Sequence, residues 1–230
     1  MDDRSLYRWG GMAAVVGALV TLVTNLLHPR ISEFDEPVPA FIEEIAGSGT
    51  WVLLHLGLVA GILLITVGLF ALGRSLKGSP AEGWARVALG SLLISTPVVL
   101  VTLGIDGYGS KAAADAWAEA AGPARQAAFA TAAAVVQVSW GCFMLMTITY
   151  VGLTPILFGA AVAASGEYPP ALGWAVAILG AGAVVAGVIG FGGQSAPFWI
   201  LFVATSGLIT LWILALGVLL GRKASARVPA

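Results

Sequence analysis

Apolar residues occur along the chain in long runs that short polar segments separate. Several runs hold about 20 residues without a charged side chain, which is the length of α-helix that crosses the ~30 Å hydrocarbon core of a bilayer. Tryptophan stands at the start of several runs, as expected for side chains that anchor a helix at the membrane interface. The pattern predicts six transmembrane helices, at residues 9–28, 51–72, 84–105, 135–164, 172–191 and 198–220.

Two segments between the runs are predicted to be short helices at the outer surface. Residues 37–46 carry apolar side chains at helical spacing with two glutamates on the opposite side, so this helix should lie flat on the interface. Residues 110–121 are rich in alanine but hold three charged side chains, which belong outside the hydrocarbon. The two helices would either form a lid over the outer mouth of the bundle or simply anchor the neighbouring spans.

The fourth span is the difficult one. The apolar stretch from Ala127 to Ser165 would be roughly 58 Å long as a helix, too long for one span and short for two. We place the membrane entry near Val135, so that the helix projects outward before it, with a kink at Pro155. The alternative is a reversal near residues 152–155, which would give seven spans and an outer C-terminus.

The distribution of charge favours six spans with both termini in the cytoplasm. Hydrophobic residues make up 59% of the chain and charged residues 10%, far from the balance of a soluble domain. The formal net charge of -1 and the lack of a dense basic cluster argue against a nucleic-acid partner. The six-span topology places only Arg30, Lys111 and Arg125 outside, as the positive-inside rule requires. The basic residues on the inner side are then Arg4, Arg8, Arg74, Lys77, Arg86, Arg222, Lys223 and Arg227.

Three side chains that can bind a metal are expected at one depth near the outer face. His28 ends the first span, His55 lies about one turn inside the second, and Asp106 follows the third. Ionisable residues at membrane depth are functional candidates by default, and His/His/Asp would suit zinc or non-haem iron. The two histidines would also suit the axial positions of haem b, with Arg30 near a propionate. The simpler interpretation makes His28 a boundary residue and His55 a hydrogen-bonded interior histidine.

A second group of polar side chains points to a pocket in the outer half of the bundle. These side chains are Asn25, Gln137, Trp140 and Gln194, which would line a site for a lipid-like or quinone-like molecule. The alternative is that they form hydrogen bonds between helices and hold the packing. The single cysteine, Cys142, excludes an intrachain disulfide and a multi-cysteine metal site.

The region around the predicted turn after the fourth span carries a family resemblance. Phe158-Gly159, then residues 165–170 with the sequence SGEYPP, then Leu172-Gly173, resemble a feature of uncharacterised bacterial six-span integral membrane proteins. The resemblance implies the same topology and a multi-pass protein of the bacterial inner membrane, and it implies no activity.

Two functions follow as expectations. The first is a non-enzymatic membrane protein with an outer-face pocket, acting as a ligand-binding or accessory subunit of a membrane assembly. The second is a haem- or metal-dependent membrane oxidoreductase that uses His28 and His55. The expected partners are the lipid bilayer and, in the first case, other membrane subunits.

Overall fold

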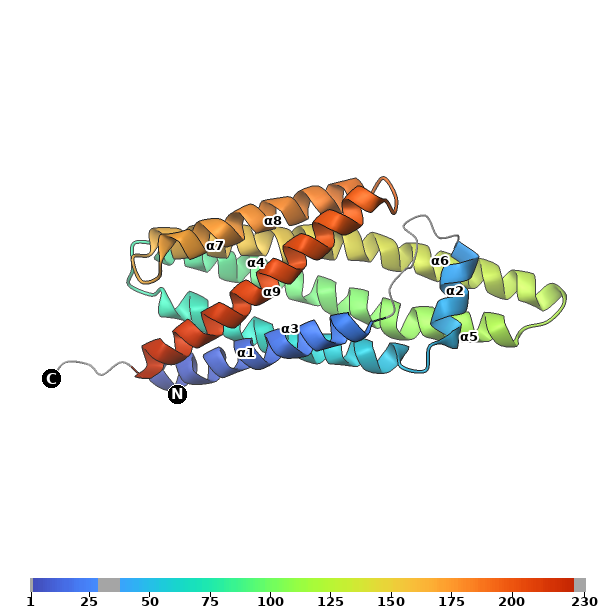
Figure 1. Cartoon of the computed structure of the whole chain (residues 1–230), viewed down its shortest axis with the longest axis horizontal. Helices are drawn as coiled ribbons and strands as arrows, with labels where there is room; N and C mark the ends of the chain where they lie inside the picture. The colour runs from blue at the N-terminus through green and yellow to red at the C-terminus, as the bar shows by residue number, and fades with distance from the viewer. Residues whose placement is uncertain (1, 29–37, 226–230) are drawn as a thin grey trace.

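The computed structural model describes residues 2–28 and 38–225, and six helical segments of this part are long and apolar enough to cross a membrane. The predicted all-α transmembrane bundle is therefore confirmed. In Figure 1, α1 begins and α9 ends at the same end of the bundle, which we call the terminal end; α5 and α6 meet at the opposite, hairpin end. The elements are α1 (Asp3–Leu27), α2 (Val38–Gly47), α3 (Trp51–Ser75), α4 (Glu82–Gly104), η1 (Ile105–Ser110), α5 (Lys111–Glu119), α6 (Pro123–Met146), η2 (Thr147–Leu153), α7 (Thr154–Ala164), α8 (Pro170–Gly190) and α9 (Ala196–Ser225).

Two of the six segments are composite rods, in which several helical elements follow one another in line, and both are longer than a membrane crossing needs. The α4–η1–α5 segment has 38 residues and the α6–η2–α7 segment has 42, whereas a bilayer core needs about 20. The helix continues through residues 152–155, where the sequence left a reversal open. The π-turn η2 ends at Leu153, and Pro155 lies in the first turn of α7. Similarly, the predicted surface helix at 110–121 is α5, but it extends α4 through the π-turn η1 instead of starting a separate element.

Small residues allow the spans to pack closely. A Cβ atom on Gly17 of α1 would lie 2.7 Å from the Gly61 carbonyl oxygen of α3, and one on Gly159 of α7 would lie 2.6 Å from the Gly173 oxygen of α8. Lipid supplies no hydrophobic force between helices, so such close backbone contact is a main source of their association.

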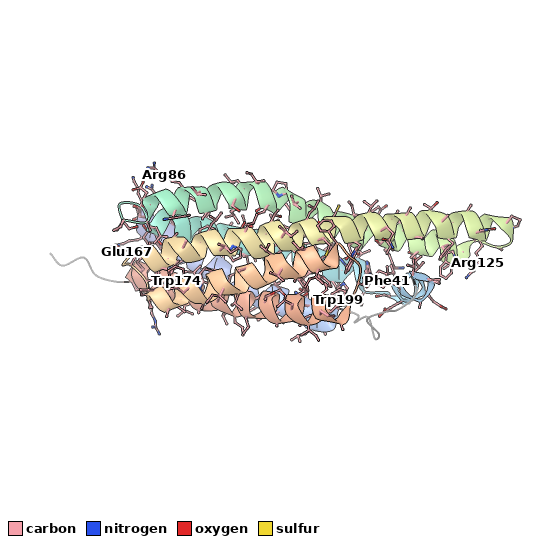
Figure 2. The ribbon with its side chains drawn as sticks, turned by 90° about the horizontal axis from the view of Figure 1, so that it is seen from above. Phe41, Arg86, Arg125, Glu167, Trp174 and Trp199 are labelled. Carbon is pink, nitrogen blue, oxygen red and sulfur yellow. The ribbon has the colours of Figure 1, made fainter. Side chains whose placement is uncertain are left out.

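The outer surface of the spans is apolar. Leu93 and Ile94 of α4 and Ile178 of α8 are 66%, 73% and 69% exposed. Continuous exposure of this kind would cause aggregation in water and is the expected state of side chains that face lipid. In Figure 2 the charged side chains Arg86 and Glu167 lie at the terminal end and Arg125 lies at the hairpin end, with the apolar belt between them.

The hairpin end has a small apolar core of its own. The α2 helix crosses the α5–α6 hairpin (Figure 1) and buries Ile42 and Ile45 completely. These side chains pack against Trp51, Ala114 and Ala132, which come from three other elements. The chain therefore builds a folded extension beyond the lipid-crossing part of the bundle.

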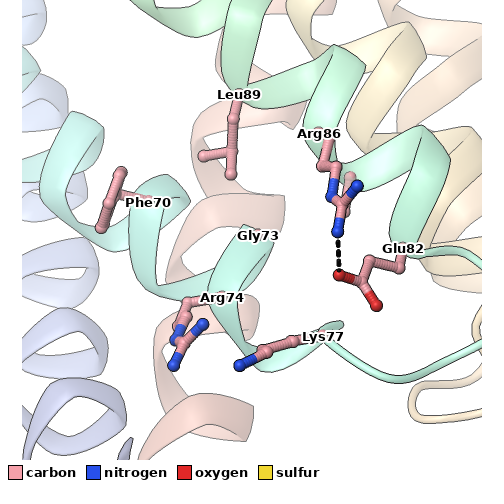
Figure 3. A pocket seen from close by; sticks show the side chains of 8 residues that line it. Phe70, Gly73, Arg74, Lys77, Glu82, Arg86 and Leu89 are labelled. Atoms are coloured by element: carbon pink, nitrogen blue, oxygen red, sulfur yellow. Dashed lines mark hydrogen bonds and ion pairs between the residues drawn. The ribbon is translucent and has the colours of Figure 1, made fainter.

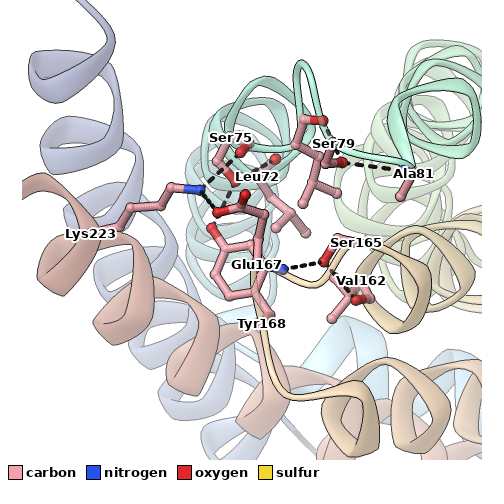
Figure 4. A network of polar contacts seen from close by, with 10 residues as sticks. Leu72, Ser75, Ser79, Ala81, Val162, Ser165, Glu167, Tyr168 and Lys223 are labelled. Carbon is pink, nitrogen blue, oxygen red and sulfur yellow. Dashed lines mark hydrogen bonds and ion pairs between the residues drawn. The ribbon is translucent and has the colours of Figure 1, made fainter.

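A polar network closes the terminal end (Figure 4). The Tyr168 hydroxyl, in the α7–α8 connection, lies 2.7 Å from the Ser75 hydroxyl at the end of α3. The Lys223 amino group of α9 donates to the Ser75 carbonyl oxygen at 3.0 Å and to the Glu167 carboxylate at 2.9 Å. These bonds tie the ends of α3 and α9 to the α7–α8 connection, three segments that are far apart in the sequence.

Candidate functional site

The hairpin end contains a histidine whose ring is engaged on both sides. His55, in the second turn of α3, is 3% exposed. Its Nδ1 atom lies 2.8 Å from the carbonyl oxygen of Trp51, one turn earlier, and its Nε2 atom lies 3.1 Å from Oδ2 of Asp106 in η1. The side chain is thus held by its own helix and by the neighbouring composite rod.

These two bonds require a proton between His55 and Asp106. A carbonyl oxygen only accepts, so Nδ1 of His55 carries the hydrogen of the bond to Trp51. The bond from Nε2 to the carboxyl group is then either imidazolium to carboxylate or neutral imidazole to carboxylic acid. In both states the Nε2 lone pair is engaged with that proton. The observed arrangement therefore binds a proton where a metal ion would need a free nitrogen.

The π-turn η1 presents its backbone to the same place. Trp51 donates its indole Nε1 hydrogen to the Asp106 carbonyl oxygen at 2.8 Å. A Cβ atom on Gly107 would lie 2.5 Å from the His55 Cβ atom, so only glycine lets η1 approach α3 this closely. A π-turn widens the helix locally and is frequent at functional sites. Here it brings both the side chain and the carbonyl group of Asp106 to α3.

His28 joins this cluster from the end of α1. Its ring centroid lies 4.8 Å from that of Trp51 and 5.0 Å from that of His55, with the histidine rings at 69°. The structure thus brings together His28, His55 and Asp106, which the sequence placed at one depth. Their contact is ring packing and one hydrogen bond, and across residues 2–28 and 38–225 no group of three or more His, Cys, Asp or Glu side chains is placed to hold a metal ion.

The haem hypothesis fits this geometry poorly. An iron with two axial histidines must lie between the rings, and here the rings are in edge-to-face contact at 5.0 Å. Arg30, the predicted propionate partner, lies outside the described residues.

The four residues predicted to line a pocket point to separate places. Asn25 is exposed and donates its side-chain amide to the Thr21 carbonyl oxygen of its own helix, and Gln137 is exposed on α6. Trp140 donates to the Gly190 carbonyl oxygen of α8 at 3.1 Å, an interhelical bond, and Gln194 lies in the α8–α9 connection. None of the four lines either hollow at the terminal end, and Trp140 matches the packing alternative.

Two hollows in the described part of the chain lie at the terminal end. One is lined by Arg74, Lys77 and Arg86. In the sequence these residues served only as markers of topology. The available signal was their position on both sides of one short connection, which forces basic side chains of two antiparallel helices together.

Comparisons with protein-family models, with curated proteins and with solved structures find no match to this chain. The resemblance to bacterial six-span proteins therefore stays an expectation.

Proposed function

We propose that this chain is a non-enzymatic accessory subunit of a membrane assembly, in the inner membrane of a bacterium, and that α6 at the hairpin end contacts its partner. The observation that carries the proposal is an uncovered face of α6. Five side chains on this face are exposed and recur at intervals of three and four residues: Ala124, Ala127, Thr131, Ala134 and Val138.

The spacing of this face suits a second helix. Intervals of three and four residues form the seam along which two helices pack, and alanine at these positions lets helix axes come close. The hydroxyl of Thr131 donates to the Ala127 carbonyl oxygen of α6 at 3.1 Å, so it needs no hydrogen bond from elsewhere. The opposite side of the hairpin is already covered by α2.

The face also suggests where the partner helix belongs. It begins at Ala124, in the part that projects beyond the other spans, and continues along α6 past Val138 to Gly141. A Cβ atom added to Gly141 would meet nothing within 4 Å, so this end of the face is also open. A helix that follows the whole face runs from water into lipid. This supports a membrane-anchored partner subunit over a soluble peptide.

The orientation follows from the basic residues. The terminal end carries Arg74, Lys77 and Arg86 around one connection and further basic residues in α1 and α9, whereas α5 and α6 carry only Lys111 and Arg125. The positive-inside rule therefore supports a cytoplasmic terminal end and an outer hairpin end.

Cysteine labelling tests this proposal. In a chain whose Cys142 is replaced by serine, we introduce Ala127→Cys or Ala134→Cys on the exposed face, and Ala118→Cys on the exposed side of α5 as the matched control. A membrane-impermeant maleimide added from outside should label the two α6 positions several-fold more slowly in native membranes than in vesicles that hold this chain alone. The control position should label equally fast in both.

Each other outcome overturns part of the proposal. Equal rates at the α6 positions in both preparations would show that no subunit covers the face. Protection that persists in vesicles with this chain alone would indicate a second copy in place of a partner. Failure of Ala118→Cys to react in intact cells would refute the outer location of the hairpin end.

The ligand-binding form of the first expected function and the expected oxidoreductase have weaker support. For a ligand-binding subunit, the predicted pocket residues Asn25, Gln137, Trp140 and Gln194 give no support, because none of them lines either hollow at the terminal end. A haem- or metal-dependent oxidoreductase would need a nitrogen of His55 that its hydrogen bonds occupy. A Soret band in the purified protein that His28→Ala and His55→Ala each abolish would overturn the non-enzymatic proposal.

A further inference from the structure

A hollow of about 220 Å³ lies at the terminal end between α3 and α4 (Figure 3). On the same measure a cavity needs only about 10–15 Å³ to hold one water molecule. Arg74 and Lys77 line it from the end of α3 and the following turn, and Glu82 and Arg86 line it from the first turns of α4. The hollow is large enough for a small charged group.

The charge of the hollow is positive. Three of its lining side chains are cationic and one, Glu82, is anionic. The Glu82 carboxylate is occupied on both oxygens, by Arg86 at 2.7 Å and by the Gly78 backbone N–H at 2.9 Å. Glu82 therefore braces the α3–α4 connection and does not reach across to the other two cations.

The remaining cations are available to a ligand. Within the described parts of the chain, no hydrogen bond or ion pair engages the Lys77 amino group, and the side chain is exposed. Arg74 donates only from its Nε atom, to the Asp3 carboxylate at 3.3 Å. The side chains of Arg74 and Asp3 are 41% and 57% exposed. Exposed pairs of this kind contribute little stability, so an incoming anion can compete for Arg74.

The part of the hollow nearer the middle of the bundle is apolar. Phe70 lies one turn before Arg74 on α3 and Leu89 lies one turn after Ala85 on α4, both on the side of the hydrocarbon. A Cβ atom on Gly73 would lie 2.7 Å from the Leu89 side chain, so glycine keeps the two helices close here. The cations lie nearer the α3–α4 connection and the apolar side chains lie nearer the middle of the bundle, which is the order of a lipid headgroup and its acyl chains.

We propose that this pocket binds the phosphate group of an anionic phospholipid from the surrounding leaflet. Basic pockets between transmembrane helices bind anionic lipid headgroups, and guanidinium groups match the geometry of phosphate oxygens. The first turn of α4 also lines the pocket through Glu82 and Ala85, and the dipole of this helix N-terminus favours an anion. The inference is independent of the accessory-subunit function.

Lipid binding to the purified protein tests the inference. Native mass spectrometry in detergent measures the affinity of the first bound lipid, with phosphatidylglycerol as the anionic probe and phosphatidylcholine as the zwitterionic one. The wild type should prefer phosphatidylglycerol, and Lys77→Gln should lower that affinity about fivefold, the usual effect of one basic residue near the surface. Adding Arg86→Gln should lower it by about the same factor again.

The matched controls are Arg4→Gln and Arg222→Gln, which remove the same charge from exposed positions outside the pocket. They should change the affinity less than about twofold, because screening weakens surface charges at a distance. Losses equal to that of Lys77→Gln would reduce the effect to general surface charge and overturn the pocket.

Two further results would also overturn the inference. Equal affinity of the wild type for the two lipids would remove the anion preference. Displacement of phosphatidylglycerol by millimolar inorganic phosphate would show that the site takes the free anion and not a lipid. Lys77→Gln should leave the melting temperature unchanged, which separates the loss of a contact from the loss of the fold.

Discussion

Replacing Asp106 separates the two roles that its side chain has in the hairpin-end cluster. Asp106→Asn keeps a hydrogen-bonding group beside Nε2 of His55, because the amide can donate to the lone pair of a neutral imidazole. Asp106→Leu removes the partner altogether. The bond of His55 to Trp51 is left in place by both variants.

The expected magnitudes follow from burial. The His55 side chain is 4% exposed and the Asp106 side chain is 29% exposed, so water cannot readily replace the lost partner at Nε2. Leaving a buried polar atom unsatisfied costs about 1–3 kcal/mol, and a kilocalorie shifts the melting temperature of a chain of this size by about 2–4 °C. Asp106→Leu should therefore lower the melting temperature by roughly 2–12 °C, and Asp106→Asn by no more than about 2 °C.

Thermal unfolding in detergent, followed by tryptophan fluorescence, measures both shifts. The matched control is Asp115→Leu, which breaks an ion pair with Lys111 in the same rod. The Asp115 side chain is 43% exposed. This loss should cost less than about 1 kcal/mol. If Asp106→Leu is as stable as the control, or if Asp106→Asn is as damaging as Asp106→Leu, the description of a proton-sharing pair is refuted.

Two other perturbations test the packing and the terminal network. Gly173→Ala would overlap the Ala163 backbone and should cost about 1–3 kcal/mol, whereas Gly141→Ala, in open space, should be neutral or stabilising by thermal unfolding. Burial raises the pKa of Tyr168 to about 12, so its contribution to stability is complete below pH 10 and is lost as the pH rises through 12. Absorbance at 295 nm should show this late titration, and Tyr168→Phe should lower its amplitude by the contribution of one tyrosine.

The fold could be predicted because its signal is the length of the apolar runs. A helix of about 20 residues without a charged side chain is most stable across a lipid bilayer, whichever helices it packs against. The less predictable feature was the continuity of α4 with α5. The charges of Lys111 and Asp115 placed this segment outside the hydrocarbon but did not say whether it turns along the surface or continues outward.

The candidate site was predictable in depth but not in contacts. The positions of His28, His55 and Asp106 along three consecutive spans gave a common level, and the structure brings these side chains together. Both nitrogens of His55 are engaged because the π-turn η1 approaches α3 closely at Gly107. The spacing of apolar and polar residues in the sequence does not predict this approach. For the same reason the sequence placed Asn25 and Gln137 in a pocket although both side chains are exposed, since helix rotation is set by packing.

The two proposals concern opposite ends of the bundle, so their tests are independent. The α6 face lies on a rod that extends beyond the other spans, while Lys77 lies in the α3–α4 connection at the terminal end. Mutational effects add when sites are distant and share no partner, so Lys77→Gln should leave the protection of Ala127→Cys unchanged. Should Lys77→Gln expose the α6 face to the maleimide, the partner subunit would depend on the bound lipid, and the two ends would have to be coupled through α3 and α4.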